Sequence, residues 1–335
     1  MRIGVDAMGG DFAPEEPVAG ALDAEKLLSE GDRIVLIGEE SAVRAHLRPH
    51  EGWERFIDIA PASQVIGMDE VPVETLRAKP DSSIARMAAL AAAGEVDAVI
   101  SAGNTGACVA AAQMRLRRLR GVHRPGIAIV VPTFYGPVTL CDVGANVNCR
   151  PIHLYQYAVM TSEYSRHICG VDEPRVGLLS IGQEDAKGTQ LVKETRELLR
   201  SAPDLDFIGN VEGRDLFHGG CDVVVTEGFV GNVALKLMEG LAEGLFQCLL
   251  GELRRSGAGQ GQFLQQAVGT IRDKYDFNEY GGAPLLGVNG VCIICHGASQ
   301  RRGLANAVRV ARDIVEARIN ERITERIAQC QGTVS

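Results

Sequence analysis

Residues 97–112 read DAVISAGNTGACVAAA, and the pattern of this stretch decides the fold of the chain. It begins as an apolar run, breaks into Ser-Ala-Gly-Asn-Thr-Gly-Ala, and resumes as an alanine-rich segment. Such a pattern predicts a buried strand, a tight glycine turn and a helix that Asn or Thr can cap. The joint between a strand and a helix is therefore the feature to follow along the chain.

The same pattern recurs from one end of the sequence to the other. Several apolar runs are apolar on both faces, as strands covered by helices on both sides must be. The predicted strands are residues 2–6, 33–38, 56–60, 97–101, 126–132, 137–142, 175–181, 206–211, 222–226 and 291–296. Alternating strands and helices imply an α/β fold with a mostly parallel, doubly wound sheet. We expect residues 1–335 to form a single α/β unit, either undivided or cleft into two lobes.

Helical patterns fill the intervals between these strands. They predict helices over residues 14–29, 83–93, 105–118, 151–167 and 188–200, and one long closing helix over residues 299–327. Residues 232–255 carry apolar side chains three and four positions apart, as an amphipathic helix does. The polar turn SGAGQGQ at 256–262 and a second helix from about 263 to 275 would complete a projecting helical hairpin, residues 232–275.

Composition and charge limit the class of function. The 335 residues are 46 % apolar, which is enough to bury a full core. The net charge of -9 disfavours a nucleic-acid-binding protein, because such proteins need a positive surface. No apolar stretch reaches the ~18 residues that span a bilayer, and the first residues lack the pattern of a secretory leader. We therefore expect a cytoplasmic protein.

Familiar motifs for cofactors, metals and covalent catalysis are missing. The sequence has no G-x-x-x-x-G-K-[ST], no G-x-G-x-x-G after a strand, no G-x-S-x-G and no H-E-x-x-H. Cys292 and Cys295 have zinc-knuckle spacing, but residues three apart on a strand face opposite ways, so we expect buried, reduced thiols. We predict no cofactor and no metal, and chemistry that depends on positioning and hydrogen bonding.

Four strand ends share a composition in which glycine accompanies Asn, Thr, Ser, Asp or Lys before a helix. They are SAGNTGA (101–107), DVGANVNCRP (142–151), SIGQEDAKG (180–188) and TEGFVGNVALK (226–236). Glycine lets the backbone approach a ligand, and free amides at a helix start attract anions. Turn geometry and helix capping alone explain any one of these joints. Four together, if they converge in one cleft, favour a site for phosphate or carboxylate.

Charged side chains near these joints each allow two interpretations. Lys187, Lys236 and His296 fit a solvated or structural role as well as contact with a ligand. No acidic residue interrupts a group of five arginines, which are Arg115, Arg117, Arg118, Arg120 and Arg124. Basic residues at a helix C-terminus complement the helix dipole, and an acidic protein partner is the alternative explanation.

Nearly end to end, the chain resembles the bacterial phosphate acyltransferases of phospholipid synthesis. The motifs that carry the resemblance are the four joints together with GVDAMGGDFAP (4–14), KPDSSI (79–84), RPGIA (124–128) and YGGAPLLGVNG (280–290). The resemblance implies a Rossmann-like three-layer α/β/α fold related to the phosphotransacetylases, and a homodimer. It also implies transfer of a fatty acyl group from acyl carrier protein to inorganic phosphate. The acyl phosphate would pass to a membrane acyltransferase that acylates glycerol 3-phosphate.

Three features of the sequence depart from the pattern of that family. Asn148 stands where the family usually has Asp, and GASQ (297–300) replaces the commoner GSSD. The turn at 256–262 is polar where some relatives carry an apolar tip. The sequence is therefore compatible both with a purely cytoplasmic protein and with one that contacts the inner face of the membrane.

Direct attack of phosphate on a thioester suggests roles for individual residues. The reaction needs an aligned phosphate and donors to the oxyanion, but no strong acid, because thiolates leave readily. We expect Lys187 to neutralise developing charge and Asn232 to orient the reactants, both as catalytic residues. Residues expected to bind substrate are Asn104, Thr105, Gly106, Gly144, Asn146, Thr226, Gly231 and His296. Residues expected to bind carrier protein are Arg115, Arg117 and Arg118.

Three other functions compete with this one. A phosphotransacetylase-like enzyme would perform the same chemistry on acyl-coenzyme A. A nicotinamide-dependent dehydrogenase of related fold is disfavoured by the missing dinucleotide motif. A non-enzymatic scaffold for an acidic partner would cause no phosphate-dependent loss of thioester.

Overall fold

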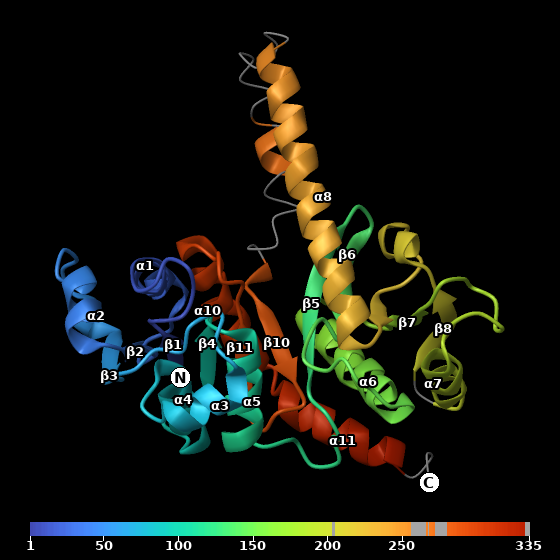
Figure 1. Ribbon diagram of the computed structural model, residues 1–335, viewed down its shortest axis with the longest axis horizontal. Helices are drawn as coiled ribbons and strands as arrows, with labels where there is room; N and C mark the ends of the chain where they lie inside the picture. The colour runs from blue at the N-terminus through green and yellow to red at the C-terminus, as the bar shows by residue number, and fades with distance from the viewer. Residues whose placement is uncertain (203–204, 256–265, 267, 272–279, 332–335) are drawn as a thin grey trace.

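A computed structural model describes residues 1–202, 205–255, 266, 268–271 and 280–331. One eleven-stranded sheet runs through these residues in the order β3-β2-β1-β4-β11-β10-β5-β6-β9-β7-β8 (Figure 1). The strands are β1 (Arg2–Asp6), β2 (Arg33–Gly38), β3 (Ile57–Pro61), β4 (Ala98–Ser101), β5 (Gly126–Thr133), β6 (Gly136–Cys141), β7 (Arg175–Leu179), β8 (Asp206–Val211), β9 (Val223–Val225), β10 (Ala283–Leu286) and β11 (Val291–Ile294).

The sheet is mostly parallel, as the sequence predicts, but its centre is antiparallel. Strands β3, β2, β1, β4 and β11 form one parallel group, and β6, β9, β7 and β8 form another. Between the groups, β10 is antiparallel to β11 and β5, and β5 is antiparallel to β6. The two groups therefore run in opposite directions, and their carboxyl ends lie at opposite edges of the sheet.

Helices cover both faces of the sheet and make the three-layer α/β/α fold. The α-helices are α1 (Glu15–Asp23), α2 (Glu40–Leu47), α3 (Pro72–Ala78), α4 (Ser83–Ala92), α5 (Thr105–Arg115), α6 (Pro151–Ile168), α7 (Gln190–Arg200), α8 (Gly228–Arg255), α10 (Arg301–Glu316) and α11 (Ile319–Gln331). Three short 3-10 helices, η1 (Ala24–Leu27), η2 (Trp53–Arg55) and η3 (Gly213–Phe217), lie in connections between these elements and the strands.

Two apolar clusters, one on each face, form the core. Side chains of α1, α2, α6, α7, α10 and α11 contribute to one cluster, and those of α3, α4 and α5 to the other. Along β4, Ile100 packs in the first cluster and Val99 in the second, which explains why the strand is apolar on both faces. Cys292 and Cys295 lie in different clusters, as expected for residues three apart on a strand.

Two expectations about secondary structure are wrong. The closing helix is not continuous: α10 ends at Glu316, and Arg318 has a left-handed backbone with φ 54° before α11 begins. The break redirects the chain so that α11 packs against α6 with Ile319 and Ile323 fully buried. No glycine or proline marks this break. Strand β10 was also not predicted, because only four residues, flanked by glycines, carry it.

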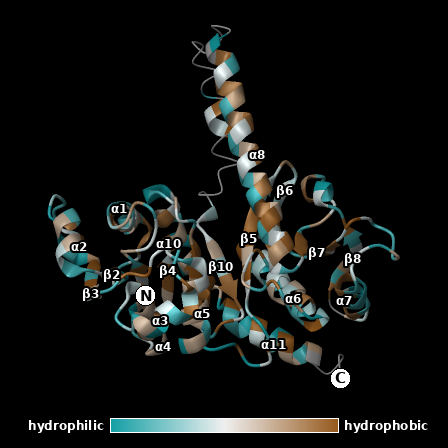
Figure 2. Ribbon diagram, viewed as in Figure 1, coloured by the Kyte–Doolittle hydropathy of each residue, from teal (hydrophilic) through white to brown (hydrophobic). Residues whose placement is uncertain are grey.

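Helix α8 extends away from the sheet (Figure 1). It begins at Gly228, four residues before the predicted start, and hydrophobic and hydrophilic residues alternate along its outer part (Figure 2). Leu237, Leu241 and Leu245 are each more than half exposed and lie four residues apart. The predicted turn 256–262 and most of the second hairpin helix lie outside the described residues. No described helix is both long and apolar enough to cross a membrane.

Candidate functional site

A pocket of about 180 Å³ lies between α8 and the centre of the sheet. Ile127 and Ile129 of β5 and Ala283 of β10 give it an apolar floor. Its polar rim joins residues from three elements, which are Thr105 of α5, Asn232, Lys236 and Glu239 of α8, and His296 and Ser299 after β11. Helix α8 starts at one edge of the sheet and crosses toward the other, so it brings together strand ends that the sheet itself separates.

The start of α5 has two backbone N–H donors without a described acceptor, and one of these two residues, Thr105, lines the pocket. The Asn104 side chain caps the helix by accepting from the Ala107 N–H at 3.0 Å. No described residue accepts a hydrogen bond from the Thr105 or Gly106 N–H, as is usual in the first turn of a helix. These donors and the positive end of the helix dipole favour an anion beside Thr105.

The Asn104 side chain holds the loop 67–70 against the start of α5. Its Nδ2 donates to the carbonyls of Gly67, Met68 and Glu70 at 3.0 to 3.2 Å, and the residue is buried. Both ends of the amide are therefore engaged inside the protein. Its predicted contact with substrate stays a prediction, while its structural role follows from these bonds.

We expect Asn104→Ala to lower the free energy of unfolding by about 1–3 kcal/mol, because three carbonyls and one helix amide lose their partner. Urea unfolding followed by circular dichroism measures this change. Thr105→Ala, which removes no bond to another described residue, is the control and should change stability by less than about 0.5 kcal/mol. Equal stability of Asn104→Ala and the wild type would contradict the structural role.

A buried carboxylate at the end of the neighbouring strand holds the turn that precedes α5. Asp6 accepts from Ser101 Oγ at 2.7 Å and from the Met8 N–H at 3.0 Å, and Ser101 Oγ accepts from the Gly103 N–H at 3.0 Å. Burial raises the pKa of the Asp6 carboxyl. A Cβ on Gly9 would lie 2.5 Å from Asp6 Oδ2, so only glycine fits there. Asp6 thus ties the loop after β1 to the turn that begins α5.

Asp142 plays the corresponding part on the other side of the pocket. Its carboxylate is fully buried and accepts from the backbone N–H groups of Ile127, Gly144, Ala145 and Asn146 at 2.8 to 3.1 Å. Burial raises the pKa of this carboxyl, and the four donors act in the opposite direction. Sequence reasoning missed both aspartates, although each ends a predicted strand inside a quoted motif.

Helix α8 begins directly against the Asp142 loop. A Cβ on Gly231 would lie 1.9 Å from the Asp142 carbonyl oxygen, so the glycine permits the close approach. The Asn146 side chain donates to the Pro125 carbonyl and to Tyr157 Oη, which uses the amide inside the loop. Thr226 is buried behind this contact. Gly144 and Asn232 remain neighbours at the pocket side.

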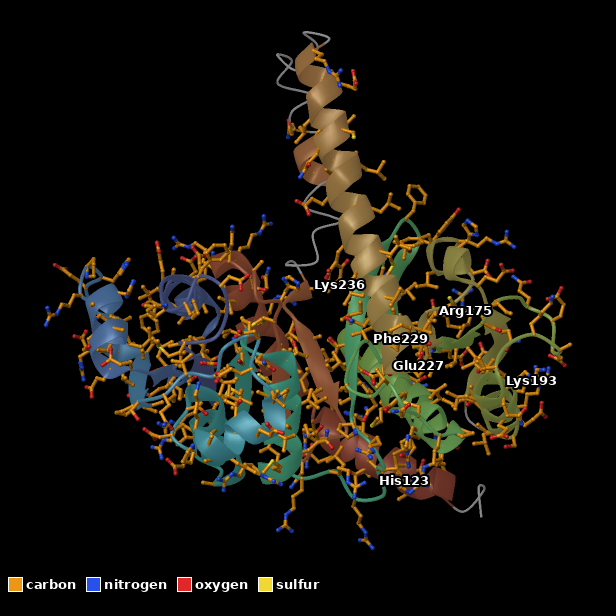
Figure 3. All side chains as sticks on the ribbon, viewed as in Figure 1. His123, Arg175, Lys193, Glu227, Phe229 and Lys236 are labelled. Atoms are coloured by element: carbon orange, nitrogen blue, oxygen red, sulfur yellow. The ribbon has the colours of Figure 1, made fainter. Side chains whose placement is uncertain are left out.

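The amides at the start of α8 are already paired. Glu227 accepts from the N–H groups of Phe229 at 2.7 Å and Val230 at 2.9 Å, and the Gly228 N–H donates to the Asn146 carbonyl. Figure 3 shows Glu227 and Phe229 at the base of the helix and Lys236 farther along it. We expected this joint to offer unpaired backbone N–H groups to an anion, but the Glu227 carboxylate already accepts hydrogen bonds from two of them. The helix serves the pocket with side chains instead.

Lys236 is the one Lys or Arg among the described residues that line the pocket. Its Nζ lies 2.8 Å from Glu239 Oε2, one turn farther along α8. Lys187, the predicted catalytic lysine, is exposed on the loop between β7 and α7 and does not line the pocket. A motif ending in lysine was visible in the sequence, but nothing there distinguished Lys236 from a solvated side chain.

His296 and Ser299 supply further donors where β11 ends. The Ala298 N–H donates to His296 Nδ1 at 3.2 Å, which in a neutral imidazole leaves the proton on Nε2. The Ser299 N–H donates to the His296 carbonyl at 2.9 Å and holds the segment in a turn. Both side chains line the pocket. An imidazole N–H and a hydroxyl can both donate to an oxyanion.

Of the predicted site residues, the structure brings Thr105, Asn232 and His296 together in the pocket. The arginines Arg115, Arg117 and Arg118 lie at the opposite end of α5 from Thr105. That helix has eleven residues, which corresponds to about 16 Å. The Arg118 guanidinium donates to the His123 carbonyl. Their predicted contact with a protein partner would therefore occur away from the pocket.

Comparisons with known proteins agree over nearly the whole chain. Residues 1–322 match the family model described as "Fatty acid synthesis protein". The chain is 45% identical to a phosphate acyltransferase of Geobacter sulfurreducens, over 98% of this chain and 94% of that protein. It is also 45% identical to a phosphate acyltransferase of Desulforamulus reducens, over 99% of both chains.

Solved structures of low sequence identity share the fold. An EutD phosphotransacetylase from Staphylococcus aureus superposes with a TM-score of 0.61 at 15% identity, over 94% of both chains. A phosphotransacetylase from Streptococcus pyogenes has a TM-score of 0.58 at 16% identity, over 98% of this chain and 94% of that chain. At these identities the likeness concerns the arrangement of the sheet and its helices.

Proposed function

The chain belongs to the phosphate acyltransferase family and transfers acyl groups to phosphate, and we propose that its donor is a fatty acyl group on acyl carrier protein. The product would be an acyl phosphate for phospholipid synthesis. The observation that carries the proposal is the pocket, in which an apolar floor on β5 and β10 meets the polar rim. A thioester needs both surfaces, one for the alkyl chain and one for the reacting carbonyl.

We propose that phosphate attacks the thioester directly. A phosphate oxygen bonds to the carbonyl carbon, the carbon–sulfur bond breaks, and the thiolate leaves with the carrier. The protein holds the two reactants in line and stabilises the oxyanion, for which the α5 amides and His296 Nε2 are the candidate donors. No acyl-enzyme forms in this scheme.

Asn232 and Lys236 hold the phosphate in this proposal, because both face the pocket from successive turns of α8. The predicted charge-neutralising role of Lys187 competes with that of Lys236. The two are separable because Lys187 lies on the loop between β7 and α7.

The nature of the donor is tested by comparing two thioesters. Long-chain acyl–acyl carrier protein and acyl-coenzyme A are each incubated with phosphate, and acyl phosphate is trapped with hydroxylamine as the hydroxamate. We expect the carrier protein thioester to give the higher kcat/KM. A higher kcat/KM for acyl-coenzyme A would assign the chain to phosphotransacetylase-like chemistry.

We propose that the acidic carrier protein docks at Arg115, Arg117 and Arg118. Its phosphopantetheine arm would then have to span the length of α5 to reach the pocket at Thr105. We expect joint replacement of Arg117 and Arg118 by alanine to raise the KM for carrier protein about fivefold and to weaken its dependence on salt. Steady-state kinetics at two salt concentrations measure both effects. An unchanged KM for carrier protein would contradict docking at these arginines and favour the alternative, in which they complement the helix dipole.

We further propose a cytoplasmic homodimer that passes acyl phosphate to a membrane acyltransferase acting on glycerol 3-phosphate. The exposed leucines of α8 support self-association, because a stripe of apolar side chains four residues apart is typical of helix-to-helix contact. Sedimentation equilibrium tests the dimer: a single protomer mass at micromolar concentration would contradict it.

A further inference from the structure

Lys236 and Glu239 form a solvent-exposed ion pair on the rim of the pocket. Their charged atoms lie 2.8 Å apart, and the side chains retain 48% and 29% exposure. Both residues line the pocket, with Lys236 its one described Lys or Arg. A phosphate bound beside Lys236 would therefore meet the Glu239 carboxylate at the same ammonium group.

The ion pair is weak enough to exchange its anion. Solvent-exposed pairs three residues apart on a helix contribute little to stability, since water solvates each partner well. A phosphate dianion carries more charge than a carboxylate and offers more acceptor oxygens. Phosphate can therefore displace Glu239 from Lys236, whereas a monoanionic carboxylate gains nothing over the group already present.

We propose that Glu239 is a specificity-determining residue that occupies Lys236 in the resting enzyme and sets the affinity and selectivity of the pocket for phosphate. This inference rests on the proposed function of the pocket. Glu239 raises the phosphate concentration needed for turnover, and in exchange it keeps carboxylate anions off the lysine. It does so through Lys236 and takes no part in bond breaking.

The same helix provides a matched control. Glu252 and Arg255 form another pair three residues apart on α8, with 2.6 Å between charged atoms, and neither lines the pocket. Replacing Glu252 by glutamine removes an ion pair of the same spacing from the same helix. Any effect that is specific to the pocket will appear at Glu239 alone.

The test is steady-state kinetics with phosphate varied at saturating thioester. We expect Glu239→Gln to lower the KM for phosphate roughly threefold to fivefold, with acetate becoming a stronger competitive inhibitor. The effect should vanish when Glu239→Gln is combined with Lys236→Met, and Glu252→Gln should match the wild type.

An unchanged phosphate KM in an active Glu239→Gln enzyme would overturn the inference and leave acyl transfer intact. The same decrease in the Lys236→Met background would also overturn it, since the effect would not act through the lysine. If the wild type forms no acyl phosphate, the proposed function fails. In that case, calorimetric titration with inorganic phosphate tests the role of Glu239. The proposed role requires that Glu239→Gln bind phosphate more tightly than the wild type does.

Discussion

Asp142→Ala is expected to lower the free energy of unfolding by at least about 3 kcal/mol, because one buried and three part-buried backbone N–H groups lose their acceptor together. The carboxylate joins the start of β5 to the loop before α6, and that loop supports the first turn of α8. Urea unfolding measures the loss, and the residual activity of folded protein measures the displacement of Asn232.

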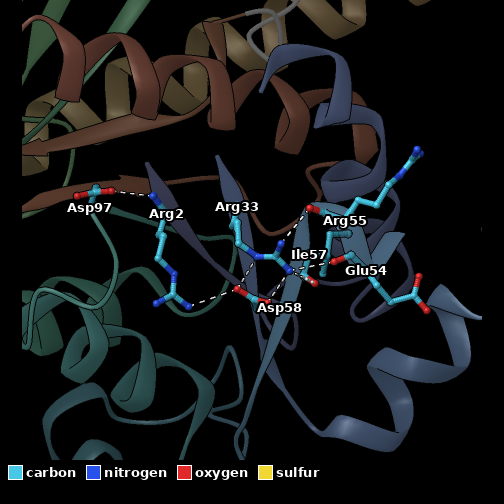
Figure 4. A network of polar contacts seen from close by, with 7 residues as sticks. All are labelled: Arg2, Arg33, Glu54, Arg55, Ile57, Asp58 and Asp97. Atoms are coloured by element: carbon cyan, nitrogen blue, oxygen red, sulfur yellow. Dashed lines mark hydrogen bonds and ion pairs between the residues drawn. The ribbon is translucent and has the colours of Figure 1, made fainter. Parts of the chain in front are cut away.

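A surface aspartate with equally good partners provides the comparison. Asp58 accepts from the Arg33 guanidinium at 2.7 and 2.8 Å, which lowers the pKa of its carboxyl, and from Arg2 at 3.4 Å (Figure 4). Its side chain is 36% exposed, so water can replace the lost bonds. We expect Asp58→Ala to cost no more than about 1 kcal/mol. Equal losses in the two variants would show that Asp142 has no special role.

Lys236→Ala is expected to lower kcat/KM for phosphate by about 10²-fold, since the pocket then lacks its one described lysine or arginine. Initial rates at low phosphate measure this parameter directly. Lys193→Ala is the control, because Lys193 lies on α7, away from Lys236 (Figure 3). Lys187→Ala belongs in the same assay. A larger loss in Lys187→Ala than in Lys236→Ala would favour the role predicted from the sequence.

Local patterns made the layers of the fold predictable. The alternation of Val99 and Ile100 between two core clusters follows from a strand that is apolar on both faces. The turn around Asn104 was predictable too, because capping is a property of neighbouring residues. Both features depend on contacts within a few positions of the chain.

Contacts between distant segments were not predictable. The bond from Ser101 to Asp6 joins residues 95 positions apart, and a strand-end aspartate gives no sign in the sequence of which loop it will hold. The antiparallel centre of the sheet was not predicted for the same reason, because the short strand β10 pairs with β5, which lies more than 150 residues away in the sequence. The position of Lys236 in the pocket was not predictable either, because it depends on how α8 lies against the sheet.

Single turnover in the presence and absence of phosphate tests direct acyl transfer to phosphate. Excess enzyme is mixed with radiolabelled acyl–acyl carrier protein, and free thiol, acyl phosphate and protein-bound label are followed in time. Direct transfer predicts no thiol release without phosphate. With phosphate, it predicts one acyl phosphate for each thiol released and no label on the enzyme. Thiol release without phosphate, with the acyl group retained on the enzyme, would contradict it.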